Sequence, residues 1–323
     1  MKKLLLKLLS ALAFVNHPRM QSSIRFYIRD NYYSRLNQLQ FVFKDYGIKR
    51  PYKIIDYQGE FQEEINYVLP FAYWHYLNGT LKKTVSCKGT KDLYYFSENH
   101  EEKYDIRDAH FAYESFDTPN KTHSISKSYG KWAQVPLKKK FANPVFVYDK
   151  PILLIANKYN MEWNNAPLNF IDIPTLNAII ESYKSKYQII YNRPSPKQIV
   201  EDNSDILDLH EQEWLRENHP EVMFMEDIYE EYSSQVNSFN HCQLMIYANC
   251  NHFISVHGGT ATLASYFGGV NIILSRGREN PVDGGGLEGL FNEFSSIFCA
   301  LSGANILHAK NEKDIMNYLS TYY

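Results

Sequence analysis

The second half of the chain alternates continuous apolar runs with segments whose apolar residues recur at helical spacing. Apolar runs predict buried strands at 151–155, 188–191, 222–225, 253–256, 271–274 and 305–308. Helical spacing predicts helices at 175–187, 211–218, 239–250, 260–267, 287–301 and 313–322. Buried strands that alternate with helices indicate a parallel sheet covered on both faces. We therefore expect a Rossmann-like α/β domain over residues 151–323.

The first half is less regular, and we expect a second α/β domain over residues 21–150. Residues 53–56 read as a strand, and 61–77 have helical spacing that Pro70 should kink. Val85 and the runs 93–96 and 145–148 are further strand candidates. The polar stretch 117–140 is expected to be a long loop, with Lys138–Lys140 as a solvated turn. A length of 323 residues agrees with two domains.

Residues 1–20 form a basic amphipathic segment that begins MKKLLLKLLSALAFV. The apolar stretch is interrupted by Lys7 and is shorter than the roughly 20 residues that a spanning helix needs. Residues 1–15 could lie in an anionic membrane surface with Lys2, Lys3 and Lys7 in water, or dock on the protein through their leucines. Both readings are favoured over a secretion signal, because no small-residue cleavage site follows. We expect a cytoplasmic protein, either unattached or peripheral at a membrane.

Composition excludes several classes of protein. The chain has 34 Lys and Arg against 36 Asp and Glu, a net charge of −2, which argues against a bulk basic surface for nucleic acid but leaves room for a local basic patch. The four cysteines form no C-x-x-C pair, so reduced and mostly buried thiols are expected. Glycine is scarce, at 15 residues, yet nine glycines fall between residues 258 and 289. This clustering marks the region in which a ligand is expected to bind.

The strongest local signal is SVHGGTAT, residues 255–262, where an apolar strand runs directly into a glycine turn and a helix. We expect Thr260 to cap the helix, and Gly258 and Gly259 to let the backbone approach an anion. His257 could donate to a phosphate or sugar oxygen. The alternative is a tight turn with a buried, satisfied histidine. The G-x-G-x-x-G match at 284–289 lacks the strand before it and the acidic partner after it, so it is read as a glycine loop.

Polar residues also close the other strands of the predicted sheet. Right-handed crossovers bring the carboxyl ends of parallel strands to one edge, where ligands bind. Cations and an amide at these ends suit a diphosphate, and two carboxylates suit a base or ribose. The candidates are Lys158, Asn192, Arg193 and Arg276 for the phosphates, and Glu226 and Asp227 for the nucleoside.

The run FISVHGGTATLASYFGG, residues 253–269, resembles the donor-binding turn of GT-B glycosyltransferases, including the heptosyltransferase-like and family-61-like groups. The layout resembles that of these enzymes over residues 50–323, and the motif does so over residues 253–278. The resemblance implies two Rossmann-like domains facing a central cleft. It also implies a nucleotide sugar as co-substrate with no bound cofactor. Such enzymes usually work without a metal, and no D-x-D occurs here.

Glycosyl transfer requires a base that takes the proton of the attacking hydroxyl. Glu60 lies at the position in the layout where some GT-B enzymes carry this base, and Glu64, His75 and His100 follow as candidates. For each of them, a solvent-facing or core position is the alternative. The expected partners are a nucleotide-sugar donor and a glycan or glycolipid acceptor, as in polysaccharide biosynthesis. A sugar-nucleotide epimerase and a non-catalytic glycan- or nucleotide-binding protein of the same fold remain open alternatives.

Overall fold

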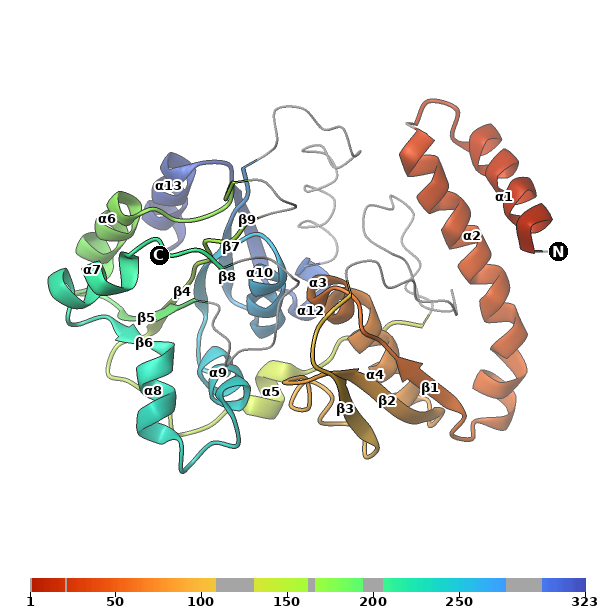
Figure 1. Ribbon diagram of the computed structural model, residues 1–323, viewed down its shortest axis with the longest axis horizontal. Helices are drawn as coiled ribbons and strands as arrows, with labels where there is room; N and C mark the ends of the chain where they lie inside the picture. The colour runs from red at the N-terminus through yellow and green to blue at the C-terminus, as the bar shows by residue number, and fades with distance from the viewer. Residues whose placement is uncertain (1, 21, 109–130, 162–165, 194–205, 277–297) are drawn as a thin grey trace. The chain divides into compact units, whose positions relative to one another are not determined.

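The structure is a computed structural model that describes residues 2–20, 22–108, 131–161, 166–193, 206–276 and 298–323 (Figure 1). The chain divides into two compact units, and the division falls between Val135 and Pro136. Each unit is built around a parallel sheet. The chain is therefore a mixed α/β protein, as its alternating pattern predicts.

The first unit contains a three-stranded parallel sheet in the order β1-β2-β3. Its elements are α1 (Lys2–Asn16), α2 (Ser22–Val42), the π-helix η1 (Phe43–Ile48), β1 (Lys53–Asp56), α3 (Phe61–Glu63), the π-helix η2 (Glu64–Val68), α4 (Leu69–Leu77), β2 (Leu81–Cys87) and β3 (His100–Tyr104). The helical connection between β1 and β2 returns the chain to a parallel neighbour, as in a βαβ unit. Strand β1 falls where the sequence predicts it.

The predicted helix 61–77 is helical throughout but is divided by the π-helix η2. Pro70 lies in the first turn of α4, where its missing N–H costs little. The irregularity that Pro70 predicts is therefore accommodated by a change of helix type just before it. All five residues of η2 are buried, including the carboxylate of Glu64.

The second unit contains a six-stranded, wholly parallel sheet in the order β6-β5-β4-β7-β8-β9. Its strands are β4 (Ile152–Ala156), β5 (Gln188–Asn192), β6 (Met223–Phe224), β7 (His252–Val256), β8 (Val270–Leu274) and β9 (Asn305–Ala309). Counted along the chain, this is the order 3-2-1-4-5-6 of a Rossmann fold. This strand order confirms the prediction of a Rossmann-like fold for the second half of the chain.

Helices of the second unit lie on both faces of the sheet (Figure 1). They are α5 (Leu137–Phe141), α6 (Ile173–Tyr183), α7 (Glu211–Asn218), α8 (Met225–Tyr232), α9 (Phe239–Ala248), α10 (Gly259–Ala264), the 3-10 helix η3 (Ser265–Phe267), α12 (Cys299–Ser302) and α13 (Glu312–Tyr322). Alternate strand residues such as Ile155 and Ile254 share one core with Leu176 of α6 and Leu319 of α13. Every residue of β4 is buried, which explains its continuous apolar sequence.

Three local predictions are wrong. Residues 93–96 form turns and not a strand, although Leu93, Tyr94 and Phe96 are buried. Residues 145–148 contain a bend at 145–146 and no strand. The run after Val222 gives only a two-residue strand, because the chain enters α8 at Met225. At 93–96 and 222–225 most of the apolar side chains are buried, whereas at 145–148 only Phe146 is buried and Val147 is 69% exposed. An aromatic or apolar run therefore does not by itself determine the backbone geometry.

The segment from α5 to residue 148 belongs to the second unit, although the sequence predicts a boundary near residue 150. Asn143 donates from Nδ2 to the carbonyl of Met245 at 2.8 Å, and Asn249 donates from Nδ2 to the carbonyl of Phe146 at 2.8 Å. Lys138 lies in α5 and not in a solvated turn. Its ammonium donates to the carbonyl of Cys250 at 3.0 Å, so this lysine helps to join α5 to the sheet.

The amino-terminal segment is helical. Helix α1 buries Leu9 and Ala13, and the ring of Phe14 meets the edge of Phe26 of α2 at 6.5 Å. Docking through a leucine face is thus observed for one side of α1. In the described part of the chain, no helix combines the length and apolar character needed to cross a bilayer.

Candidate functional site

The order of strands in the second unit reverses between β4 and β7. From β4 the chain adds β5 and β6 on one side, and from β7 it adds β8 and β9 on the other. The two strands pair directly, with Ala156 opposite Ser255. Loops that follow such strands diverge, and open α/β sheets bind ligands at the carboxyl ends on either side of this point. A residue predicted to bind phosphate is therefore a stronger candidate if it lies close to the point between β4 and β7.

Lys158 and Gly258 meet at this reversal. Gly258 has φ +131° and ψ −162°, a backbone conformation that is practically restricted to glycine. A Cβ at this position would lie 3.3 Å from Nζ of Lys158. The ammonium group therefore lies against the backbone of the glycine turn. The structure brings together one predicted cation and the predicted glycine turn.

The helix after the turn begins one residue earlier than expected. Gly258, and not Thr260, is the N-cap, and α10 starts at Gly259. Thr260 is nearly buried, whereas the Thr262 hydroxyl donates to the carbonyl of Gly258 at 3.1 Å. Thr260 cannot cap the helix because it is already helical. The predicted cap is therefore wrong by two residues.

His257 forms part of a polar cluster at the ends of β7, β8 and β9. Its Nδ1 lies 3.3 Å from the Ser275 hydroxyl, and its backbone N–H donates to the carbonyl of Leu274 at 3.0 Å. Nε2 of His308 lies 3.0 Å from the carbonyl of Ser275, so this nitrogen must carry the proton. Burial lowers the pKa of His308 from its usual value. Ser275 and His308 thus add two polar residues to those predicted at the carboxyl edge of this sheet.

Arg276 follows β8 directly but is held by its own surroundings. Its guanidinium donates to the carbonyl of Leu168 at 2.7 Å and forms an ion pair with Glu312. The same group lies over the ring of Phe170, 5.2 Å from its centroid. Glu312 therefore balances the charge of Arg276.

Arg193 is engaged in a buried ion pair. Its Nη1 donates to both carboxylate oxygens of Glu211 at 2.6 Å, and Nη2 donates to the carbonyl of Leu207. The side chains of Arg193 and Glu211 are 6% and 0% exposed. Tyr191 adds a hydroxyl that donates to Glu211 at 3.0 Å. The guanidinium therefore ties the end of β5 to α7 and is not presented to a ligand as an isolated charge.

Asn192 has a structural environment as well. Its Nδ2 donates to Oε1 of Gln243 at 2.9 Å and to the hydroxyl of Tyr247 at 2.8 Å, both on α9. Asn157, at the end of β4, similarly donates to the carbonyl of Ile171 at 2.9 Å and to the hydroxyl of Tyr191 at 3.0 Å. These two amides fix the ends of the central strands to the covering layers.

Glu226 and Asp227 lie in the first turn of α8, not in a loop after a strand. Asp227 is exposed and accepts two hydrogen bonds from Arg216, at 2.6 and 2.8 Å. They follow β6, which lies two strands away from β4 in the sheet. At a strand spacing of about 4.8 Å, this places them roughly 10 Å from the reversal. The structure does not bring them together with Lys158.

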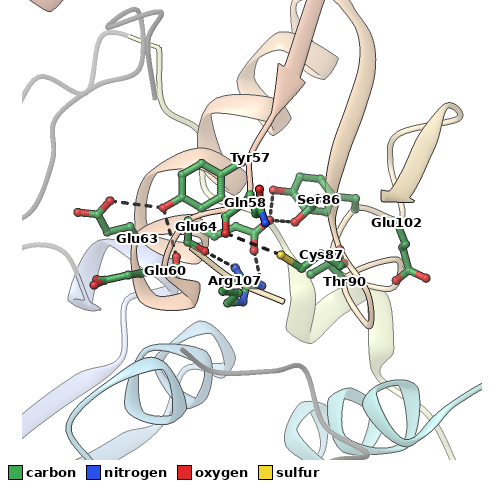
Figure 2. A network of polar contacts seen from close by, with 12 residues as sticks. Tyr57, Gln58, Glu60, Glu63, Glu64, Ser86, Cys87, Thr90, Glu102 and Arg107 are labelled. Atoms are coloured by element: carbon green, nitrogen blue, oxygen red, sulfur yellow. Dashed lines mark hydrogen bonds and ion pairs between the residues drawn. The ribbon is translucent and has the colours of Figure 1, made fainter. Parts of the chain in front are cut away.

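The first unit contains a buried polar network centred on Glu64 (Figure 2). One carboxylate oxygen accepts from the Ser86 hydroxyl and from the Tyr94 hydroxyl, the latter at 2.8 Å. The other oxygen pairs with Nη2 of Arg107 at 2.7 Å. The side chains of Glu64 and Arg107 are both inaccessible to solvent. A carboxylate in this state is paired on both oxygens and has no access to an acceptor hydroxyl.

The loop after β1 carries Glu60 and is fixed by the same network (Figure 2). Nη1 of Arg107 donates to the carbonyl of Gly59 at 2.7 Å, and the Tyr57 hydroxyl donates to the carbonyl of Glu60 at 3.3 Å. A Cβ at position 59 would lie 2.5 Å from the Tyr57 hydroxyl, so a side chain there would have to displace this hydroxyl. Glu60 itself is half-buried. Its backbone is therefore fixed, and the residue as a whole is partly accessible to solvent.

The two histidines among the candidate bases are enclosed by the fold. His75 is fully buried, its Nδ1 lies 2.7 Å from the Thr80 hydroxyl, and burial lowers its pKa to about 2. His100 lies between the hydroxyls of Thr84 and Thr90, at 2.9 and 3.3 Å, and stacks on Tyr94. Burial lowers the pKa of His100 as well. Both imidazoles have the surroundings of neutral structural histidines.

Sequence reasoning missed the residues that contact the predicted ones. Glu211 could not be assigned to Arg193 from local spacing, whereas His308 ends a predicted strand and could have been found. The glycine loop 284–289 and Arg278 lie outside the described residues, as do most of the expected helix 287–301 and part of the expected loop 117–140. Within the described ranges, no three His, Cys, Asp or Glu side chains gather closely enough to hold a metal ion.

Comparisons with known proteins give two distant structural likenesses. The E. coli heptosyltransferase WaaC with ADP matches at 12% identity over 90% of this chain and 78% of that chain, with a TM-score of 0.35. The catalytic domain of starch synthase IV from Arabidopsis thaliana, bound to ADP and acarbose, matches at 11% identity over 94% of this chain and 70% of that chain, with a TM-score of 0.28. No protein-family model and no curated protein matches the chain. These scores are too low for residue correspondences to be taken from either structure.

Proposed function

We propose that the protein is a glycosyltransferase that takes a sugar from a nucleotide-sugar donor. The single observation that carries the proposal is the contact of Lys158 with the Gly258 turn at the β4–β7 reversal of a Rossmann-ordered sheet. The ammonium group and the backbone of the turn suit a diphosphate. The resemblance of residues 253–269 to a donor-binding turn supports this ligand over other anions.

Lys158 acts on the leaving group in this proposal. As the bond to the sugar breaks, negative charge accumulates on the nucleoside diphosphate, and a cation already in place stabilises that charge. His257 lies directly before the turn and contacts Ser275, so its ring is held beside the same strand ends. Arg193, Arg276 and Asn192 are proposed to act indirectly, by fixing the strands and loops around the turn.

Glu60 is the proposed general base. Glu64 and His75 are fully buried, and the two ring nitrogens of half-buried His100 lie against threonine hydroxyls. Glu60 is half-buried on a loop whose backbone is held by Arg107 and Tyr57. A base must be accessible to the acceptor hydroxyl and positioned within hydrogen-bond reach of it. The acceptor is proposed to be a glycan or glycolipid at an anionic membrane surface that residues 1–15 contact. Transfer is proposed to need no bound metal.

The test begins with the donor. Nucleoside diphosphates and nucleotide sugars are screened for thermal stabilisation of the full chain, because a ligand that binds only the folded state raises Tm. Lys158→Ala should weaken binding of the best nucleotide about ten- to hundredfold, the loss of one charge-assisted hydrogen bond. Lys310→Ala, at an exposed lysine of the same unit, is the matched control. No stabilisation by any nucleotide would contradict the proposal.

A second measurement separates transfer from binding. Glu60→Gln should lower the rate of sugar transfer by about 10²- to 10⁴-fold while nucleotide affinity is retained. Nucleotide binding without transfer in the unaltered chain would favour a non-catalytic binding protein. Conversion of the nucleotide sugar without an acceptor would favour an epimerase. Full activity of Glu60→Gln would remove Glu60 from the mechanism.

A further inference from the structure

Charge is distributed very unevenly along the chain. Residues 1–50 contain ten Lys and Arg and two Asp, a net charge of +8. The whole chain has a net charge of −2, so the remainder carries −10. The basic segment coincides with α1, α2 and η1, which together we name the basic hairpin (residues 2–48). A cationic surface on an otherwise acidic protein points to an anionic partner.

Helix α1 has an exposed apolar stripe opposite its docked face. Leu4, Leu8, Leu12 and Val15 recur at intervals of four, four and three residues and are 65%, 61%, 48% and 75% exposed. Leu9 and Ala13, which are buried, lie on the other side of the helix. Lys3 and Lys7 precede Leu4 and Leu8, so exposed cations flank the stripe. In the described part of the chain, nothing covers these leucines.

A second stripe runs along the end of α2 and into η1. Leu36, Leu39, Phe43 and Tyr46 are 39%, 65%, 73% and 55% exposed, at intervals of three, four and three residues. Arg35 and Lys44 are exposed beside them. Two helices of the same basic segment thus combine exposed apolar residues with cations. This composition is typical of helices that lie in the interface of a bilayer.

The basic hairpin is attached firmly to the first unit at its carboxyl end. Asp45 is fully buried, accepts from the Tyr52 hydroxyl at 2.6 Å and pairs with the ammonium of Lys131 at 2.6 Å. Nδ2 of Asn78 donates to the backbone carbonyl of Asp45 at 2.7 Å. The ring of Phe41 stacks on Tyr52. Binding of the hairpin to a surface would therefore hold the β1-β2-β3 sheet at that surface.

We infer that the basic hairpin is a docking surface for anionic lipid bilayers, with both apolar stripes at the boundary between headgroups and acyl chains. The lysines and arginines contact lipid phosphates, which supply the complementary negative charge. A second copy of this chain is a poorer occupant, because two basic hairpins, each with a net charge of +6 over residues 2–48, repel each other. The inference widens the membrane contact of the proposed function from residues 1–15 to residues 2–48. It does not depend on which reaction the protein performs.

The test uses the full chain and sedimentation with vesicles. Vesicles of phosphatidylcholine alone are compared with vesicles of phosphatidylcholine and phosphatidylglycerol, at low and high salt. We expect binding to the anionic vesicles and release by salt, because screening weakens contacts between exposed charges. The variants Leu4→Gln/Leu8→Gln/Leu12→Gln and Lys3→Glu/Lys7→Glu should each weaken binding about tenfold or more. Leu39→Gln/Phe43→Gln tests the second stripe in the same way.

Matched controls come from the second unit. Val147→Gln removes an apolar side chain that is 69% exposed, and Lys310→Glu reverses an exposed charge, so neither should change vesicle binding. Equal binding to neutral vesicles, or unchanged binding by the hairpin variants, would overturn the inference. A dimer that the triple leucine variant abolishes would assign the stripe to a second copy instead. Nucleotide affinity, measured on the same variants, should be unaffected and reports separately on the proposed function.

Discussion

Lys158 and Gly258 face each other across the β4–β7 pair, with Nζ of Lys158 3.3 Å from the place where a side chain at 258 would begin. The two residues are distant in sequence and adjacent only because β4 and β7 pair in the centre of the sheet. Their contact makes position 258 doubly restricted, by its backbone conformation and by the ammonium group. Four measurements would test this and the related features of the two units.

Gly258→Ala should impair nucleotide binding more than it impairs folding. Its φ of +131° is strained for alanine by about 1–3 kcal/mol, and the new methyl group would displace the Lys158 ammonium. Calorimetry should show a loss of nucleotide affinity of about tenfold or more. Gly303→Ala is the matched control. Gly303 also has positive φ, at +81°, but within the described ranges no atom beyond its chain neighbours lies within 4 Å of the place that a Cβ would take. Equal affinities for the two variants would refute the idea.

Arg193→Met should destabilise the second unit by about 3–5 kcal/mol, because it leaves the Glu211 carboxylate buried without its countercharge. Urea denaturation measures the loss directly. Arg216→Met breaks the exposed pair with Asp227, whose side chains are 47% and 49% exposed, and should cost less than about 1 kcal/mol. Near-normal stability of Arg193→Met together with lost nucleotide binding would instead return Arg193 to the phosphate site.

Glu64→Gln and Glu60→Gln should separate stability from catalysis. The first leaves Arg107 buried without a countercharge and should lower the free energy of unfolding by about 3 kcal/mol or more. The second changes a half-buried loop residue and should alter stability by less than about 0.5 kcal/mol. Thermal denaturation of both variants checks the contrast. A stable Glu64→Gln protein without transferase activity would make Glu64 the better base.

The free energy of unfolding should decrease as the pH is lowered, because His75 takes up a proton in the unfolded chain but not in the folded one. Its pKa is lowered from 6.5 to about 2 in the folded protein by burial, and further by Lys53 and Lys131. The unfolded chain therefore binds a proton that the folded chain excludes, and the stabilisation present above pH 6.5 is lost as the pH falls toward 2. Between about pH 7.5 and pH 5.5 the loss from this group should be about 1.4 kcal/mol.

His75→Gln should remove that contribution to the slope of unfolding free energy against pH, measured with urea. His210→Gln is the control, because the His210 side chain is 73% exposed and should leave the slope unchanged. An unchanged slope for His75→Gln would mean that His75 is not held neutral in the folded chain.

The second unit was predictable from the sequence because β4, β5, β7 and β8 are almost entirely buried. Strands β4, β5, β7, β8 and β9 all fall within one or two residues of the apolar runs that predict them. Helix α8 was missed because its first residue, Met225, continues the apolar run of β6. Helix α2 was not predicted, because its buried side chains include the polar residues Asn31 and Ser34 as well as Ile28 and so form no clear apolar stripe.

The candidate site was only partly predictable, because local sequence does not show which charges pair. Lys158 and Arg193 both follow a strand at the same edge of the sheet, and spacing cannot distinguish them. The buried pair that α7 forms with Arg193 through Glu211 appears only in the tertiary structure. Similarly, nothing near Glu64 in the sequence indicates that Arg107 returns to pair with it. The motif and the topology locate an edge of the sheet, and only the tertiary structure shows what each side chain at that edge contacts.

The position of β4 in the sheet also has a consequence for synthesis of the protein. Leu154 of β4 pairs with Phe253 of β7, about a hundred residues later, whereas it pairs with Ile190 of β5 much sooner. During translation, β4 and β5 can form a partial sheet while the opposite edge of β4 still lacks its neighbour. An open edge of this kind exposes unpaired backbone groups and favours aggregation. We therefore expect the nascent chain to be most dependent on chaperones between the emergence of β5 and that of β7.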